Sequence, residues 1–403
     1  MNIEQARKID YWIGVPLCFL LSGLNFVQKA VYFKKKKSGS AKKILFLKFS
    51  ELGAIILAYP LLNRIKKEYT GAELFFVTFR TNNPVFKLLN GIILDKNILS
   101  IREEPLFFIL DTLKAIKRLR KEGIDVIFDL EFFSRFSAIF AYFVKSDKKI
   151  GFYRYTFEGL YRGNILTHKI QYNPLNHIAK NYLSLSQVVE QRIKNRPQLE
   201  LNTNNSELAF PRYVSVSKTK ERMLNKIRAL GCAAEKNKLF LLNPGEGVLP
   251  LREWPIENFI KLTNLILAEQ DCYIVIIGTK EAAGKANYIL KNVNNPRCIS
   301  LVNQTELDEL LELFVISDAL ISNDCGLAHL AMLASIKKFI IFGPESPQVF
   351  GPLTGNSYII YSNWPCSPCL SALNHRKSSC QDNQCLKSIK SEYVFDLISK
   401  NLK

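Results

Sequence analysis

The sequence is poor in acidic residues relative to basic ones. Its 403 residues include 36 Asp and Glu against 55 Lys and Arg, which gives a formal net charge of +19. Such a surplus favours an anionic partner: a nucleic acid, an anionic membrane surface or a phosphorylated substrate. The chain lacks RNP-like, zinc-finger and helix-turn-helix signatures, so we expect no nucleic-acid partner. With 48% hydrophobic and 23% charged residues, the composition is that of a folded chain with two or three domains.

The chain also lacks the cysteine density of a disulfide-stabilised protein, with nine cysteines in all. The odd number, and the lack of a recognisable cleaved signal peptide, indicate a reducing, cytoplasmic compartment. Four of the cysteines follow the pattern C-x2-C-x10-C-x4-C, which can form a zinc site, but the second pair lacks the spacing of a zinc knuckle. We therefore predict free thiols or a structural link, and no metal, for Cys366, Cys369, Cys380 and Cys385.

No uninterrupted apolar run reaches the roughly 20 residues that a membrane span needs. Residues 11–33 come nearest, but Gly14, Pro16 and Asn25 are among the residues that interrupt them. Their aromatic residues, followed by four lysines at 34–37, are typical of a helix at an anionic membrane interface. The alternative is a hydrophobic helix docked on its own domain, with the lysines in a solvated linker. The first interpretation places the protein peripherally on the cytoplasmic face of the inner (plasma) membrane.

From residue 42 onward, short apolar runs alternate with longer helical patterns, which indicates parallel sheets with right-handed crossovers. We expect strands at 42–49, 72–79, 125–131, 238–243, 272–278, 319–323 and 337–343. A polar, turn-rich stretch at 193–210 separates two series of such strands. The sequence therefore predicts an α/β fold of two Rossmann-like domains, with parallel sheets that face each other across a cleft.

The predicted boundaries follow from these shifts in composition. Residues 1–40 form the hydrophobic and basic segment, 41–205 the first Rossmann-like domain, 206–360 the second, and 361–403 a cysteine-containing tail with a terminal helix.

Three turns after predicted strands of the second half carry residues suited to a nucleotide diphosphate. In the first, Gly245 lets backbone N–H groups face an anion, and Arg252 follows as a guanidinium for a phosphate. In the next, Glu281 lies just past a strand, where a carboxylate can bind ribose hydroxyls. In the third, a helix begins at Gly326, so its N–H groups and positive dipole end can cradle a diphosphate. One such turn is weak evidence, whereas three in order are much stronger.

Four segments carry a resemblance to a known family. They are ILFLKFSELGAIILAYPLL, PGEGVLPLREWPIENFIKL, SNDCGLAHLA and FGPESPQVFGP. They are similar, in this order, to a Leu-Gly-Asp opening, a Pro-Gly…(Lys/Arg)-x-Trp-Pro stretch, an Asn-Asp-(Ser/Thr)-Gly-x-x-His motif and a Phe-Gly-Pro segment. The chain thus resembles glycosyltransferase family 9, which includes the ADP-heptose:lipopolysaccharide heptosyltransferases. The similarity runs from about Lys43 to Cys385.

The resemblance implies a GT-B fold and an inverting transfer that needs no metal or other cofactor. It also implies a nucleotide-diphosphate-sugar donor, held by the second domain, and an acceptor at the first. By position, Arg252 would contact the diphosphate and Glu281 the ribose. The backbone of Cys325, Gly326 and Leu327 would cradle the phosphates.

Two further residues of the third turn have alternative interpretations. Asp324 would lie near the transferred sugar, but its position also suits a helix N-cap. His329 would donate to the donor, or is instead a packed, hydrogen-bonded core histidine.

The chain departs from the family at the general base. Where the family has Asp in Leu-Gly-Asp, this chain has Ala54, and alanine cannot take the proton of an acceptor hydroxyl. Glu51 is the replacement candidate in the same turn, and its alternative is a solvated turn glutamate.

A group of polar residues at predicted strand ends of the first domain suits a phosphorylated acceptor, although scattered surface charge is the alternative. The group contains Glu131, Arg135, Arg154, Arg162 and His177.

Two function classes follow. The first is a membrane-surface glycosyltransferase that adds a sugar, with heptose as a candidate, to a lipid-linked envelope glycan such as a lipopolysaccharide core. The second is a catalytically silent GT-B relative that binds nucleotide sugar or glycan as a scaffold, which the missing Asp favours. A nicotinamide-dependent dehydrogenase is disfavoured, because no G-x-G-x-x-G follows the first strand.

Overall fold

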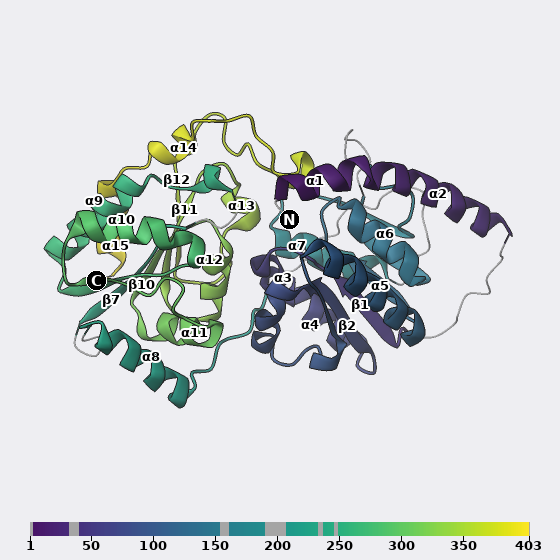
Figure 1. Ribbon diagram of the computed structural model, residues 1–403, viewed down its shortest axis with the longest axis horizontal. Helices are drawn as coiled ribbons and strands as arrows, with labels where there is room; N and C mark the ends of the chain where they lie inside the picture. Colours follow the sequence, from purple (N-terminus) through teal and green to yellow (C-terminus); the bar gives the residue numbers. More distant parts are fainter. Residues whose placement is uncertain are drawn as a thin grey trace. The chain divides into compact units, whose positions relative to one another are not determined.

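The computed structural model describes residues 3–31, 40–153, 161–189, 207–232, 237–245 and 249–402. The chain divides into two units, Met1–Ala209 and Phe210–Lys403, and each is built on a six-stranded parallel sheet (Figure 1).

The sheet of the first unit has the strand order β3-β2-β1-β4-β5-β6, and all neighbouring strands are parallel. Its strands are β1 (Lys43–Leu47), β2 (Glu73–Phe79), β3 (Ile98–Ile101), β4 (Val126–Asp129), β5 (Lys148–Tyr153) and β6 (His168–Gln171). Its α-helices are α1 (Ile3–Trp12), α2 (Gly14–Val31), α3 (Leu52–Leu57), α4 (Tyr59–Glu68), α5 (Pro105–Glu122), α6 (Arg135–Val144) and α7 (Ile178–Ser184). Short 3-10 helices are η1 (Arg80–Leu88), η2 (Asp95–Asn97) and η3 (Leu185–Val188).

The second unit repeats this arrangement with the order β12-β11-β10-β7-β8-β9. Its strands are β7 (Lys238–Asn243), β8 (Cys272–Ile276), β9 (Cys298–Ser300), β10 (Ala319–Asn323), β11 (Lys337–Phe342) and β12 (Ser357–Tyr361). Its α-helices are α8 (Ser217–Ala229), α9 (Ile256–Glu269), α10 (Ala283–Val293), α11 (Leu307–Ile316), α12 (Gly326–Leu330), α13 (Pro347–Phe350), α14 (Gln384–Lys387) and α15 (Ser391–Asn401). Its 3-10 helices are η5 (Pro250–Arg252), η6 (Lys280–Ala282), η7 (Ala331–Leu333) and η8 (Ala372–Asn374).

Counted along each unit, both sheets read 3-2-1-4-5-6, which is the Rossmann order. This confirms the predicted pair of Rossmann-like units. Central strands such as β4 are buried along their whole length, because helices cover both faces of a parallel sheet. The predicted cleft between the units stays a prediction.

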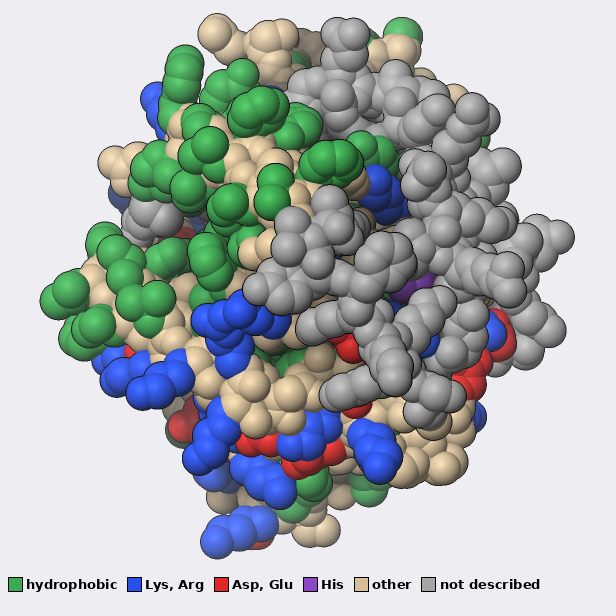
Figure 2. Space-filling view, turned by 90° about the vertical axis from the view of Figure 1, so that its right-hand side faces the viewer, with side chains coloured by type: hydrophobic (Ala, Val, Ile, Leu, Met, Phe, Trp, Pro, Cys, Tyr) green, Lys and Arg blue, Asp and Glu red, His purple; other side chains and the backbone are tan. Residues whose placement is uncertain are grey.

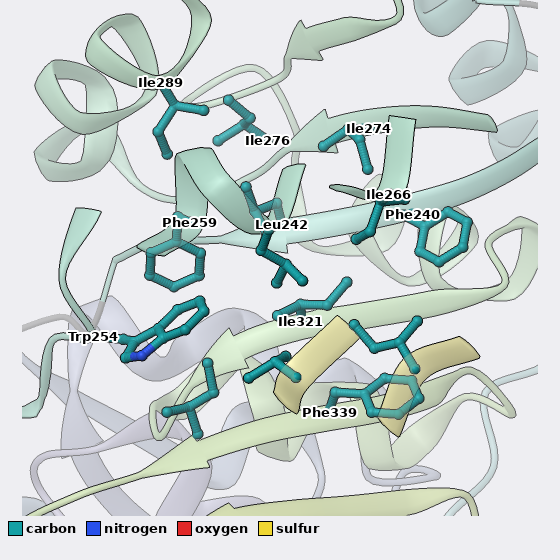
Figure 3. Close-up of a cluster of buried hydrophobic side chains, with 14 of the residues drawn as sticks. Phe240, Leu242, Trp254, Phe259, Ile266, Ile274, Ile276, Ile289, Ile321 and Phe339 are labelled. Carbon is teal, nitrogen blue, oxygen red and sulfur yellow. The ribbon is translucent and has the colours of Figure 1, made fainter. Parts of the chain in front are cut away.

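The core of the second unit joins the sheet to the carboxyl-terminal helix. Trp254 lies edge-on to Phe259 at 4.8 Å between ring centroids, among the buried side chains of Figure 3. Its indole N–H donates to the carbonyl of Ile389 at 3.0 Å, just before α15. The Trp-Pro segment of the sequence therefore anchors the end of the chain.

Two predicted helices are shorter than expected. The pattern at 52–69 predicts one helix, but the structure has α3 and α4, which are separated at Ala58 because Pro60 lies in the first turn of α4. The pattern at 326–335 also predicts one helix, but α12 ends at Leu330 and continues only as the 3-10 turn η7.

The amino-terminal helices α1 and α2 run along α6 of the first unit (Figure 1). Cys18 and Leu21 of α2 are buried against Ala138 and Ile165. By length and composition alone, the segment Gln5–Gln28 is long and apolar enough to cross a membrane.

Candidate functional site

The turn that follows β1 is held in place by Glu131, which lies in the turn after β4. These strands are neighbours at the centre of the sheet, where the strand order reverses and open α/β sheets bind their ligands. One carboxylate oxygen of Glu131 accepts the backbone N–H of Phe49 at 2.7 Å, and the other accepts from Lys48 Nζ at 3.0 Å. Both side chains of this ion pair are buried. Glu131 therefore fixes the turn, and its contact with an acceptor stays a prediction.

Glu51 ends this turn in a conformation that residues other than glycine rarely adopt, with φ at 69° and ψ at 90°. Its side chain is 41% exposed, and Oε2 lies 3.8 Å from Lys48 Nζ. Ala54 lies in the first turn of α3, where its N–H donates to the carbonyl of Glu51 at 2.9 Å. The carboxylate of this turn thus comes from a strained, accessible residue three positions before Ala54.

The other residues predicted to face an acceptor have partners within the protein. Arg135 is ion-paired to Asp10 at 3.1 Å and donates to the carbonyl of Tyr161. Arg162 is ion-paired to the fully buried Asp129, whose pKa is raised by burial although the guanidinium opposes that rise. These guanidinium charges are therefore compensated inside the first unit.

The two remaining members of the predicted acceptor group are His177 and Arg154. The ring of the buried His177 caps α7, because its Nδ1 accepts the N–H of Ala179 at 3.1 Å. Arg154 lies outside the described residues. An acceptor role for either residue stays a prediction.

In the second unit, the turns after β7 and β10 are joined by two asparagine side chains. Asn243, at the end of β7, donates to Ser322 Oγ at 2.9 Å and lies 3.1 Å from Cys325 Sγ. Asn323, at the end of β10, donates to the carbonyl of Pro244 and accepts the N–H of Trp254 at 3.1 Å. Since β7 and β10 are neighbours at the reversal point of this sheet, the predicted donor turns lie together.

Arg252 and Asp324 form the charged centre of this region. Arg252 Nη1 lies 3.5 Å from Asp324 Oδ2, and the two side chains are only 14% and 5% exposed. Burial raises the pKa of Asp324, and Arg252 opposes that rise. The helix N-cap is Cys325, so the interpretation of Asp324 as the N-cap is wrong.

Glu345 belongs to the same cluster, and sequence reasoning missed it. It is almost fully buried just after β11, and burial, aided by the charge of Asp324, raises the pKa of its carboxyl to about 8. Arg376 Nε lies 2.9 Å from its Oε1. The signal was present in the sequence, because Glu345 follows a buried strand in the Phe-Gly-Pro segment.

The predicted phosphate cradle is at the start of α12. Gly326 is exposed and Leu327 half-buried, whereas Cys325 and His329 are buried. Burial raises the pKa of the Cys325 thiol, which therefore stays protonated at neutral pH. At the start of α12, the exposed polar groups therefore belong to the backbone, and the Cys325 side chain is buried.

Glu281 lies at the surface on the turn after β8. Its Oε2 accepts from Thr279 Oγ1 at 2.5 Å, and this hydrogen bond lowers the pKa of the carboxyl. Gly278 has a φ of 154°, and a Cβ there would come within 2.9 Å of Ala282 Cβ. A Cβ at Gly245 would lie 3.4 Å from the same atom, so glycines let the turns after β7 and β8 approach each other.

The four clustered cysteines are free thiols in the structure, from the exposed Cys366 to the buried Cys385. Burial, with the three neighbouring cysteines, raises the pKa of Cys385 to about 11. Within the residues that the structure describes, no group of three or more His, Cys, Asp or Glu side chains is arranged to hold a metal.

Comparison with known proteins identifies a family. Residues 112–379 match the model of glycosyltransferase family 9 (heptosyltransferase). Lipooligosaccharide heptosyltransferase 2 of Haemophilus ducreyi is 31% identical over 150 residues, which is 36% of this chain and 42% of that protein. Lipopolysaccharide heptosyltransferase 2 of Escherichia coli is 27% identical over 120 residues, 29% of this chain and 34% of that protein. The chain thus spans between a third and a half of these relatives.

Solved structures share the fold over nearly the whole chain. The ADP-heptose lipopolysaccharide heptosyltransferase II of E. coli matches with a TM-score of 0.66 and 20% identity, covering 89% of this chain and 98% of that one. A family 9 glycosyltransferase from Veillonella parvula matches with a TM-score of 0.68 and 14% identity, covering 90% and 97%. E. coli heptosyltransferase WaaC with ADP gives 0.62 and 13%, covering 89% and 99%. These matches confirm the predicted GT-B fold.

Proposed function

The chain belongs to glycosyltransferase family 9, and from this we propose that it transfers a sugar from a nucleotide-diphosphate-sugar to a lipid-linked glycan of the cell envelope, such as a lipopolysaccharide core. Heptose is the favoured sugar, because the curated relatives are named as heptosyltransferases and a structural relative as an ADP-heptose enzyme. The reaction proceeds with inversion at the transferred carbon.

The observation that carries the proposal is the donor region of the second unit. Arg252, paired with Asp324, supplies a partly exposed guanidinium beside the exposed start of α12. A guanidinium and backbone N–H groups are the donors that bind a diphosphate well. We assign the diphosphate to Arg252 and the backbone of Cys325, Gly326 and Leu327, and the ribose to the ionised Glu281. Gly245 lies in the turn after β7, Asp324 is assigned to the transferred sugar, and His329 donates to the donor.

We propose Glu51 as the general base of the reaction. The acceptor oxygen bonds to the anomeric carbon while the bond from that carbon to the diphosphate breaks, and Glu51 takes the hydroxyl proton. Its exposure, and the strain at φ 69° in a turn fixed by Glu131, support this role, because strained residues cluster at functional sites. Arg252 stabilises the charge on the departing diphosphate.

We place the protein at the cytoplasmic face of the inner membrane, held peripherally by its amino-terminal helices. The support is a set of exposed apolar side chains on α1 and α2, among them Trp12 at 73% and Phe26 at 75% exposure. The lysine run at 34–37 lies outside the described residues.

The experiment is a panel of ADP-, GDP- and UDP-sugars, scored first by thermal shift of the full chain and then by product formation. Arg252→Ala should weaken donor binding by 1.5–3 kcal/mol, about 10- to 150-fold, the usual loss for a charged hydrogen bond. Arg222→Ala is the control for loss of a guanidinium elsewhere on the same unit, because Arg222 lies half-exposed on α8, where it pairs with Asp308 and with the buried Glu309. Equal donor affinity in both variants would remove the proposed donor region.

A second candidate function is a silent relative that binds nucleotide sugar or glycan as a scaffold. Ala54 favours it, since the family's carboxylate is missing there. Donor binding without turnover for any sugar in the panel would support the scaffold.

A further inference from the structure

The large apolar side chains that are exposed on the first unit gather on neighbouring helices. They lie on α1 and α2 and on the first half of α5, and α6 packs against both α2 and α5. On α5 these residues are Leu106, Phe107, Ile109, Leu110 and Leu113, and Phe143 of α6 adds to them. Figure 2 shows hydrophobic side chains gathered at the left of the view, with Lys and Arg side chains below them. Exposed apolar side chains that gather in this way mark an interaction surface.

The opposite side of α1 and α2 is fixed to the unit by polar contacts. Asp10 accepts the N–H groups of Arg135 and Phe136 at 3.0 and 2.9 Å, so it caps α6 in addition to pairing with the Arg135 side chain. Ser22 Oγ accepts the N–H of Asn164 at 2.6 Å. A helix that crossed a bilayer would have to break these contacts and leave the buried Arg135 without Asp10. The geometry therefore favours helices that lie along a membrane surface.

α5 carries an apolar stripe that becomes basic along its length. Leu106, Leu110 and Leu113 are followed on the same side by Lys117 and Lys121, and all five are exposed. The last turns of the helix also carry Lys114, Arg118 and Arg120 at the surface.

The two carboxylates of α5 are already engaged. Asp111 pairs with Arg102 at 2.8 Å, and Glu122 pairs with Lys43 at 2.6 Å. The exposed cations of α5 thus suit an anionic surface, beside leucines that suit its hydrocarbon boundary.

We propose that α5 is a second membrane-contacting element, so that the first unit docks on an anionic lipid surface through α1, α2 and α5 together. The inference rests on the proposed membrane association and adds to it the second helix and an orientation along the membrane. Two observations favour a lipid surface as the partner of this region. The exposed cations of α5 complement anionic headgroups, and α5 is joined to α2, with its exposed apolar side chains, through α6.

The test is co-sedimentation of the full chain with phosphatidylethanolamine vesicles that contain phosphatidylglycerol. The variant Leu106→Glu/Leu110→Glu/Leu113→Glu should partition at least tenfold less than wild type, because it places carboxylates where lipid contact is proposed. Leu175→Glu is the matched control, since Leu175 is 69% exposed on the same unit and Leu106 is 67% exposed. Equal partitioning of the triple variant and wild type overturns the inference, and so does a loss seen equally in the control.

Depth-dependent quenching gives a second readout that does not rely on loss of binding. In a Trp12→Phe background, Leu110→Trp should be quenched by brominated lipid, and Leu175→Trp should not. Light scattering of the triple variant tests for a second copy as occupant: a change in mass without a change in vesicle binding overturns the proposal. Donor binding is measured in the same variants. Its absence in wild type refutes the proposed function, whereas unchanged vesicle binding of the triple variant refutes only this inference.

Discussion

Replacing Glu51 by glycine should separate the stability of the first unit from its activity. Glu51 holds a positive φ of 69° that costs a residue with a Cβ on the order of 1–3 kcal/mol. Glycine removes that cost but adds about 0.5–1 kcal/mol of conformational entropy to the unfolded chain. The clean comparison is with Glu51→Ala, because both variants lose the contact between Glu51 and Lys48, which at 3.8 Å and 41% exposure is worth at most about 1 kcal/mol.

The expected result is that Glu51→Gly is more stable than Glu51→Ala by about 1 kcal/mol, while both lose turnover by roughly 10²–10⁴-fold, the usual contribution of a positioned base. For a unit of about 200 residues, such a difference moves the melting temperature by about 2–4 °C. Differential scanning fluorimetry measures the first quantity and product formation the second. Glu51→Gln serves as the variant that keeps both shape and strain.

Two outcomes would refute this reasoning. A glycine variant no more stable than the alanine variant would mean that the turn is not strained. A glycine variant that retains wild-type turnover would remove Glu51 as the base. Restoring the family residue through Ala54→Asp in the Glu51→Gln background should recover part of the activity, because Ala54 lies three residues after Glu51, in the first turn of α3.

Three further predictions concern stability. Because burial raises the pKa of Glu345 to about 8, the folded state keeps a proton that the unfolded state releases above the ordinary pKa near 4.5. The free energy of unfolding should therefore fall from about pH 4.5 to 8, by up to about 1.4 kcal/mol per pH unit. Glu345→Gln should remove that slope from urea titrations, and an unchanged slope would contradict the buried proton. Asp10→Asn should destabilise the chain by about 3–5 kcal/mol, since it removes the carboxylate that pairs with the buried Arg135 guanidinium. Asp308→Asn, in an exposed pair, should cost at most about 1 kcal/mol, and equal losses would mean that the Asp10 pair is effectively solvated. Gly278→Ala should lower the melting temperature, because its Cβ would come within 2.9 Å of Ala282 Cβ. Gly284→Ala should raise the melting temperature, because Gly284 lies on α10 and its added Cβ would have no atom within 4 Å. The reverse order would show that the turn after β8 has room for a Cβ.

The sequence predicted the central strands and the order of the donor turns, because both depend on local patterns. Strands such as β7 and β10 are continuous apolar runs with a polar turn after each, and that signal needs no knowledge of the rest of the chain. Five strands were missed: β3, β5, β6, β9 and β12. Four of them, β3, β6, β9 and β12, lie at the edges of the sheets and have only three to five residues, which carry little pattern. β5 lies inside its sheet, but its two lysines and Gly151 interrupt the apolar run.

The partners of charged residues could not be predicted in the same way. The sequence assigned Arg135 and Arg162 to an acceptor, with scattered surface charge as the alternative. Their partners are distant in the sequence: Asp10 lies 125 positions from Arg135, and Asp129 lies 33 positions from Arg162. Only the folded chain brings these groups together. Glu345 was missed for the opposite reason: its place after a buried strand was visible, but its burial beside Asp324 was not.

The cap that Asp10 forms on α6 also has a consequence for the order in which the chain is made. Its partners lie 125 residues downstream, so at about 5–20 residues per second the ribosome needs roughly 6–25 s to supply them. During that interval α1 and α2 have no folded unit against which to bury Cys18 and Leu21. Under the proposed membrane docking, this apolar segment is made before its docking surface and contacts the membrane before the rest of the first unit exists. We therefore expect membrane attachment to precede folding, so that the sheet of the first unit forms on a chain already held at the lipid surface.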